Sequence, residues 1–96
     1  LSRIFTTTEL AYAKDNATTL AGNFAVKEAV SKVFGTGFFG VEPYEIEVLR
    51  NESGAPYVKL YGKAKEIAKD KQVSRIHVSI TNTREFAQAF AIGECV

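Results

Sequence analysis

ATTLAGNFAVKEAVSKVFGTG, residues 17–37, is the stretch that decides the fold. Its apolar positions recur at helical spacing: Val26, Ala29, Val30, Val33 and Phe34. Asp15 or Asn16 can cap the start of such a helix, because a short polar side chain accepts from its first free N–H groups. Gly35 ends the pattern, as expected of a residue that readily adopts a left-handed conformation. The stretch therefore predicts one long helix, from about Ala17 to Phe34.

Shorter elements are expected on both sides of this helix. Upstream, three threonines before Glu9 and Leu10 are typical of a capped short helix, and a lysine-rich helix is expected downstream at 62–71. The remaining apolar runs and alternations predict strands at 45–48, 57–60, 76–80 and 85–92. Because short neighbouring strands joined by tight turns pair antiparallel, the predicted class is α+β. We expect an antiparallel sheet packed against one long and several short helices.

The last expected strand is apolar on both faces. One face carries Phe86, Phe90 and Ile92. The other face carries Ala87, Ala89 and Ala91. A strand with two apolar faces is typical of the interior of a sheet or of a subunit interface.

The composition is that of one small globular domain, 1–96, with a modest core. No apolar run approaches the length of a membrane span, and no signal-like segment opens the chain. A net charge of +1 names no partner, since nucleic-acid binding needs a clustered basic face. Cys95 is the only cysteine, which excludes an internal disulfide and fits a reducing, cytoplasmic compartment.

Glu28 and Lys32 are the first candidates for chemistry, because residues four apart share one face of a helix. The spacing alone favours a surface ion pair worth about 0.3–0.5 kcal/mol. The functional alternative is a carboxylate that binds a hard cation beside an ammonium that binds phosphate. Carboxylate oxygen suits Mg²⁺, which takes few protein ligands together with substrate phosphates, and lysine suits a phosphate oxygen.

Other polar residues carry weaker signals. Gly35-Thr36-Gly37 favours a helix stop and a turn, although its flexible backbone would let a ligand approach. His77 is the single histidine, and nothing beside it forms a nucleophile triad, so a solvated or hydrogen-bonded structural histidine is expected. The polar residues at the end of the third strand indicate a turn, although strand ends also carry sites.

Taken in order, several segments resemble one enzyme family. Residues 20–32, LAGNFAVKEAVSK, resemble the signature helix of the phosphopantetheinyl transferases, Phe-x-x-Lys-Glu-Ala-x-x-Lys. Three more segments resemble the small, stand-alone holo-acyl-carrier-protein synthases: Arg3-Ile4-Phe5-Thr6 with Glu9-Leu10, Gly35-Thr36-Gly37, and His77-Val78-Ser79-Ile80-Thr81. Gly54-Ala55-Pro56 falls where that family has a Gly-Lys-Pro turn. The resemblance covers essentially the whole chain, and the helix signature is its most specific part.

The resemblance implies a reaction, a cofactor and an assembly. The reaction moves 4′-phosphopantetheine from coenzyme A to a serine of apo acyl carrier protein and releases 3′,5′-ADP, as part of fatty acid biosynthesis. Mg²⁺ would sit on the pyrophosphate of coenzyme A. The assembly would be a homotrimer of the 4′-phosphopantetheinyl transferase fold, with active sites at subunit boundaries. Neither nucleic acid nor a membrane is expected as a partner.

The resemblance also assigns roles to single residues. Glu28 would be catalytic as a metal ligand, and Lys32 would be catalytic by contacting phosphate or the leaving group. The positions implied to border coenzyme A are Asn23, Phe24, Lys27, Gly35, Thr36, Gly37, Pro56, Ser79, Asn82 and Thr83.

Three departures from the family pattern bear on the site. The family's second metal ligand is an aspartate on an N-terminal strand that would precede Leu1. Because the chain contains no methionine, we expect it to be trimmed there. Asn82 stands where the family usually has histidine, and Asn23 where arginine is common. These two differences are expected to change coenzyme affinity more than reaction type.

Two alternatives to an active transferase remain open. A degenerate relative would bind coenzyme A or a carrier protein without turnover, as Asn23 and Asn82 suggest. A small nucleic-acid-binding domain would need aromatic and basic residues on one sheet face, of which Tyr57 and Lys59 offer only a fragment.

Overall fold

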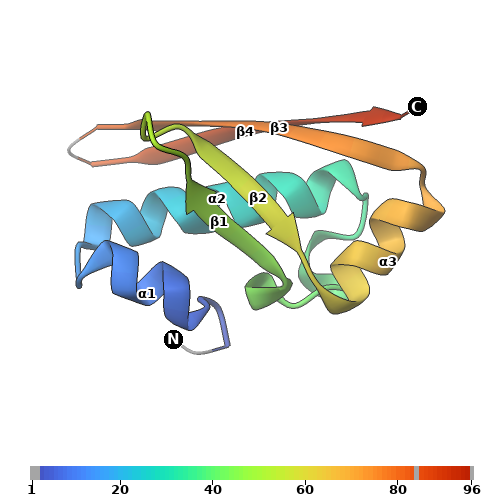
Figure 1. Ribbon diagram of the computed structural model, residues 1–96, viewed down its shortest axis with the longest axis horizontal. Helices are drawn as coiled ribbons and strands as arrows, with labels where there is room; N and C mark the ends of the chain where they lie inside the picture. Colours follow the sequence, from blue (N-terminus) through green and yellow to red (C-terminus); the bar gives the residue numbers. More distant parts are fainter. Residues whose placement is uncertain (1–2, 84, 96) are drawn as a thin grey trace.

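A long helix runs through the computed structural model, which describes residues 3–83 and 85–95 (Figure 1). The predicted α+β class is confirmed. The helices are α1 (Thr7–Ala13), α2 (Ala17–Val33) and α3 (Gly62–Asp70), with short 3-10 turns η1 (Gly37–Phe39) and η2 (Pro43–Glu45). The strands are β1 (Ile46–Arg50), β2 (Pro56–Leu60), β3 (Val73–Asn82) and β4 (Ala87–Cys95). Leu1, at which the sequence suggested trimming, lies outside the described residues.

Both ends of α2 form as the sequence predicts. Asn16 caps the start, where its side chain accepts a hydrogen bond of 3.1 Å from the backbone N–H of Thr19. Gly35 adopts a φ of +77° just past the end. The N–H groups of Gly35 and Thr36 then turn back to the carbonyls of Lys32 and Ser31, at 3.0 and 3.2 Å. These paired bonds satisfy carbonyls that a helix end otherwise leaves free.

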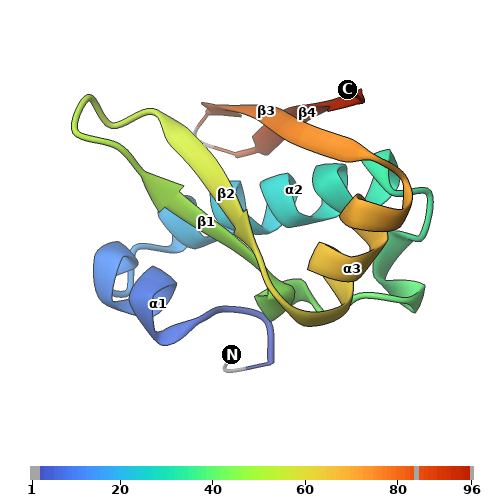
Figure 2. The same cartoon turned by 45° about the vertical axis from the view of Figure 1, so that its right-hand side comes forward.

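The strands form two antiparallel hairpins. In the first, Ile46 of β1 pairs with Leu60 of β2. In the second, β3 pairs with β4 over nearly its full length. The predicted antiparallel pairing is therefore confirmed, with the strands divided between two two-stranded sheets. β3 and β4 run along α2, whereas β1 and β2 cross it obliquely (Figure 1 and Figure 2).

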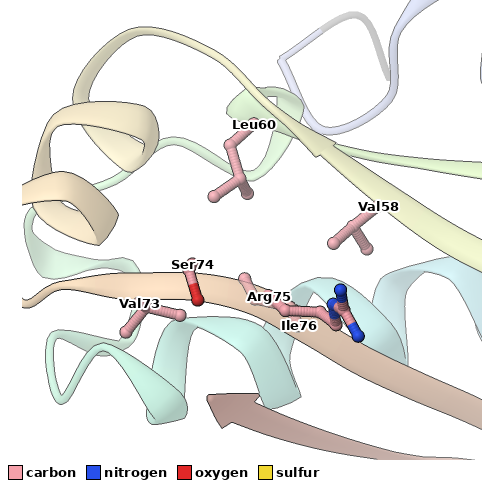
Figure 3. A pocket seen from close by; sticks show the side chains of 6 residues that line it. All are labelled: Val58, Leu60, Val73, Ser74, Arg75 and Ile76. Atoms are coloured by element: carbon pink, nitrogen blue, oxygen red, sulfur yellow. The ribbon is translucent and has the colours of Figure 1, made fainter. Parts of the chain in front are cut away.

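The two hairpins approach each other along β2 and β3 without a shared ladder. Val58 and Leu60 of β2 face β3 across a shallow pocket (Figure 3). The other side of this pocket is formed by Val73, Ser74, Arg75 and Ile76. None of these residues belongs to the predicted site, so the pocket marks a gap between hairpins rather than the expected cleft.

The apolar face of α2 forms the centre of the core. Val26, Val30 and Phe34 are fully buried and join a cluster with Ile46 and Val48 of β1. This confirms the face assigned from helical spacing. One residue of β1 departs from the expected alternation: Glu47 is only 6% exposed, because Thr6 and Tyr61 both donate hydrogen bonds to its carboxylate.

β4 presents two different surfaces. Its alanines at 87, 89 and 91 are half-buried on the side of α2, whereas Phe90 and Ile92 on the outer face are 72% and 64% exposed. Phe86, just before the strand, is 67% exposed. Within the described residues, β4 pairs only with β3 and so leaves one strand edge unpaired.

None of the helices described here combines the length and the apolar character that a membrane crossing requires.

Gly93 provides a test of how closely β4 packs on α2. A Cβ at this position would lie 2.8 Å from Val33 Cγ1 and 3.2 Å from Val73 Cγ1. We expect Gly93→Ala to lower the free energy of unfolding by about 1–3 kcal/mol, because an added methyl overpacks the contact. Urea denaturation followed by circular dichroism measures this. Adding Val33→Ala should recover part of the loss; unchanged stability of Gly93→Ala alone would contradict the packing described.

Candidate functional site

Glu28 and Lys32 lie one turn apart on the exposed face of α2. Among the residues described, the two salt bridges are Lys27–Glu9 and His77–Glu94. The surface ion pair that the spacing of Glu28 and Lys32 allows therefore does not form. A carboxylate and an ammonium are left side by side without each other as partner, which suits a ligand carrying both a cation and phosphate.

Lys27, the residue next to Glu28, points the other way and is fully buried. Its ammonium donates to Glu9 Oε1 at 2.8 Å and to the carbonyls of Ile46 and Pro43 at 2.6 and 3.0 Å. Three acceptors use all three of its hydrogens. The predicted contact of Lys27 with the coenzyme is therefore corrected: the side chain holds the fold together.

Glu9 completes this buried cluster. Its carboxylate accepts from the backbone N–H groups of Thr6 and Val48, both at 2.9 Å, in addition to Lys27. Burial lowers the pKa of Lys27, while the hydrogen bond and charge of Glu9 oppose that shift. The cluster ties α1, α2 and β1 together, and it fixes the rotation of α2 that turns Glu28 and Lys32 outward.

Asn23, one turn before Lys27, is also fully buried and meets the end of β1. Arg50 Nη2 donates to Asn23 Oδ1 at 2.9 Å, and its guanidinium carbon lies 5.5 Å from the centre of the Tyr12 ring. Pro56, another predicted site residue, is the partner of Arg50 in the β1–β2 register. Arg50, which the sequence did not single out, thus contacts Asn23 through its side chain and pairs with Pro56 through the strand register.

The predicted residues of β3 divide between two faces. Asn82 packs on α2, since a Cβ on Gly22 would lie 3.3 Å from its Oδ1. Ser79 is exposed on a strand whose Val78 and Ile80 are half-buried, so it lies on the face away from α2. Thr83 follows the strand and is exposed. Asn82 therefore joins the α2 residues, and Ser79 does not.

Phe24 links α2 to the loop that follows it. Its ring centroid lies 5.7 Å from that of Phe38 in η1, and Phe24 itself is 37% exposed. Gly35 and Gly37 both have positive φ, and the space where their side chains would lie is open. The predicted glycine loop therefore has open space at its two glycines, next to an aromatic pair on the Glu28 side of the helix.

Glu28 fits a hard cation that is held mainly by its substrate. The described part of the chain holds no cluster of three or more His, Cys, Asp or Glu side chains suited to a metal. Mg²⁺ does not need one, since it often takes one or two carboxylates together with phosphate oxygens and water. An exposed carboxylate without an ion-pair partner matches that use.

Glu9 and Arg50 were not singled out as site-forming from the sequence. The capping-box pattern from Thr6 to Glu9 was visible, and both of its hydrogen bonds form. The contact of Glu9 with Lys27 joins residues far apart in the sequence, so no local pattern predicts it.

The expectation of a hydrogen-bonded structural histidine is confirmed, since His77 pairs with Glu94 on the exposed face of the β3–β4 hairpin. That contact lowers the pKa of Glu94.

Residues 1–93 match the model of the 4′-phosphopantetheinyl transferase superfamily. The chain is 53% identical over its whole length to a holo-[acyl-carrier-protein] synthase of Lachnoclostridium phytofermentans, of which it covers 79%. It is 42% identical to one of Halothermothrix orenii, with 98% of this chain and 78% of that protein covered. Among solved structures, that of the Helicobacter pylori holo-[acyl-carrier-protein] synthase with coenzyme A is similar at a TM-score of 0.88 and 27% identity, covering 98% of this chain and 80% of that one.

The buried Lys27–Glu9 pair provides a test of what supports the site. We expect Lys27→Met to lower the free energy of unfolding by about 3–5 kcal/mol, because it leaves a buried carboxylate without its cation. Equilibrium urea denaturation measures this. The matched control is Lys32→Met on the exposed face, expected to change stability by no more than about 0.5 kcal/mol.

A double variant separates the pair from simple loss of packing. Adding Glu9→Gln to Lys27→Met removes the uncompensated charge and should recover part of the lost stability. Strictly additive effects of the two changes would show that the ion pair is not coupled as described.

Proposed function

The chain belongs to the 4′-phosphopantetheinyl transferase superfamily, and we propose that Glu28 and Lys32 of α2 form the centre of its transferase site. It transfers 4′-phosphopantetheine from coenzyme A to a serine of apo acyl carrier protein. The assignment of residues rests on the contrast in burial between two consecutive residues, Lys27 and Glu28. Lys27 is locked inside the protein, whereas Glu28 projects to solvent with Lys32 one turn away.

The reaction forms one bond and breaks one. The serine oxygen bonds to the β-phosphorus of coenzyme A, the bond from that phosphorus to the 3′,5′-ADP oxygen breaks, and the proton of the serine hydroxyl passes to solvent water. Because charge spreads over the phosphate oxygens during such transfers, positioning and charge neutralisation supply most of the catalysis. Lys32 donates hydrogen bonds to these oxygens, and the loop from Gly35 to Gly37 borders the nucleotide.

We propose Mg²⁺ as the cofactor, held by Glu28. Glu28 would hold the ion, which when bound would supply neutralisation of the pyrophosphate charge. The support is that the carboxylate is exposed and lacks an ion-pair partner, while the neighbouring ammonium can balance the remaining phosphate charge. Asn82 and Thr83, at the end of β3, are assigned to hydrogen bonds with the substrate beyond the reacting atoms; the support is that Asn82 packs beside Gly22 of α2 and that Thr83 is exposed.

We further propose that the protein works as a homotrimer that assembles through the outer face of β4. Exposed Phe90 and Ile92 and the unpaired strand edge support this, since large apolar side chains exposed together are typical of interaction sites. Ser79 lies on the same outer face of the hairpin, so assembly brings it to a subunit boundary. The single cysteine is consistent with activity in the cytoplasm.

Glu28→Gln tests the metal assignment. It keeps the size of the side chain and removes its charge. We expect kcat/KM to fall by about 100-fold or more, because even outer partners of metal ligands cost about 10–100-fold when changed. The assay is Mg²⁺-dependent mass gain of an apo carrier protein supplied with coenzyme A, using the full-length protein.

The control for this test is Glu66→Gln, which removes an exposed carboxylate from α3. It should retain wild-type turnover, and both variants should unfold at the wild-type temperature. Unchanged turnover of Glu28→Gln would contradict the metal assignment. Calorimetric binding of coenzyme A by the wild type without any turnover would instead identify a degenerate relative.

Phe90→Asp tests the assembly. A buried carboxylate at a subunit interface is costly without a partner, so we expect the trimer to dissociate and activity to fall with it. Light scattering coupled to size exclusion measures the mass. Tyr57→Asp, at an aromatic of β2 that is 46% exposed, is the matched control and should leave the mass unchanged. A monomeric wild type, or an intact Phe90→Asp trimer, would rule out this interface.

A further inference from the structure

Gly22 lies inside α2 although its backbone conformation does not require a glycine. It is buried, and it is the single glycine between Ala17 and Val33. Its φ is not positive, unlike those of Gly35 and Gly37 beyond the end of the helix. Because glycine is less favourable than alanine inside a helix, the reason for this glycine lies in its packing.

The end of β3 fills the space beside Gly22. A Cβ at this position would lie 3.1 Å from Ile80 Cγ2, and 3.3 and 3.5 Å from Oδ1 and Nδ2 of Asn82. Ile80 and Asn82 are two positions apart on a strand, so both face α2. The amide of Asn82 therefore lies directly against the helix, at a distance that any residue larger than glycine would disturb.

Asn82 combines this contact with exposure to solvent. The residue is exposed, whereas Gly22 beside it is buried. An exposed side chain ordinarily changes rotamer within nanoseconds. Here α2 confines one side of the amide and limits those changes, while the other side can meet a ligand. A polar group that is already oriented binds at a lower entropic cost than one that the ligand has to order.

We propose that Gly22 is a positioning residue: its missing side chain lets the Asn82 amide settle against α2, in the orientation in which it hydrogen-bonds coenzyme A. This inference rests on the proposed function, in which Asn82 is assigned to the substrate. The contact differs from the one at Gly93, where a Cβ would meet the apolar side chains of Val33 and Val73. Beside Gly22 the amide can turn away into solvent, so an added methyl displaces Asn82 rather than opening the core.

Gly22→Ala tests the proposal, in an assay of the full-length protein with Mg²⁺, coenzyme A and an apo carrier protein. We expect KM for coenzyme A to rise about fivefold, the size of one lost hydrogen bond, because the methyl moves the amide out of place. kcat should stay within about twofold, since Asn82 binds beyond the reacting atoms. The unfolding temperature should stay within about 5 °C of the wild type, because the gain in helix propensity offsets the closer packing.

Asn82→Ala shows whether Gly22 acts through the amide. It should raise KM for coenzyme A by the same factor, and adding Gly22→Ala to it should raise KM no further. Gly40→Ala is the matched control and should leave KM unchanged, because a Cβ there would lie at an ordinary contact distance, 3.8 Å, from Thr36 Cγ2. Unchanged KM in Gly22→Ala or in Asn82→Ala, or effects that multiply in the double variant, would overturn the proposal.

A measurement on the wild type covers the case in which Gly22→Ala does not fold. The NMR signals of the Asn82 side-chain N–H₂ group are assigned by their loss in Asn82→Ala. Without coenzyme A, their order parameter should be closer to that of ordered backbone, about 0.85, than to that of flexible groups, below about 0.6. Free motion of this amide would contradict its confinement by α2 and overturn the proposal.

A wild type that binds coenzyme A without turnover would reject the proposed function and leave this inference testable. Calorimetry then compares the binding of coenzyme A to the wild type and to Gly22→Ala. Binding about fivefold weaker in the variant supports the positioning role, and equal binding overturns it.

Discussion

One buried ion pair, Lys27 with Glu9, sets the geometry on which the rest of the structure depends. A lysine without solvent contact is costly unless every hydrogen of its ammonium is bound. Here the acceptors come from three separate segments, so the charge can be satisfied only when α1, η2 and β1 are all in place around α2. The cost of burying the charge thereby becomes a constraint on the relative positions of the elements rather than a simple gain in stability.

The burial of Lys27 also determines which side chains of α2 face the solvent. Consecutive helical residues point about 100° apart, so fixing Lys27 inward fixes Glu28 outward. Lys32 follows one turn later on that exposed side, while Val26 and Val30 remain in the core. The periodicity of one helix thus arranges an apolar face, a buried ion pair and an exposed face, and the proposed site pair, Glu28 and Lys32, is positioned by the helix itself. The short turn that follows then places Gly35 and Gly37, with open space where their side chains would lie, at the end of the same helix.

Local signals in the sequence predicted most of the fold. Helical spacing, the Asn16 cap and the Gly35 stop defined α2 to within one residue at its end, because each acts through neighbours in the chain. Contacts between residues far apart in the sequence could not be predicted in this way. Glu47 alternates with apolar residues as a solvent-facing strand residue would, yet Thr6 and Tyr61 bury it. Likewise, the motif that contains Lys27 and Glu28 led to the prediction that both residues contact the substrate. Glu9, which binds the Lys27 ammonium, lies 18 positions upstream, so helical periodicity cannot predict the contact.

The residues predicted to border coenzyme A do not all lie on one face of this chain, for a geometric reason. Successive residues of a strand face opposite sides, so Asn82 and Ser79 of β3 cannot both face α2. Asn82 contacts Gly22, whereas Ser79 shares the outer face with Phe90, its register partner on β4. A substrate that touched both residues of a single chain would have to pass around the hairpin. If both border one molecule of coenzyme A, they must come from different copies, and the exposed apolar side chains beside Ser79 are the surface through which a second copy would bring it there.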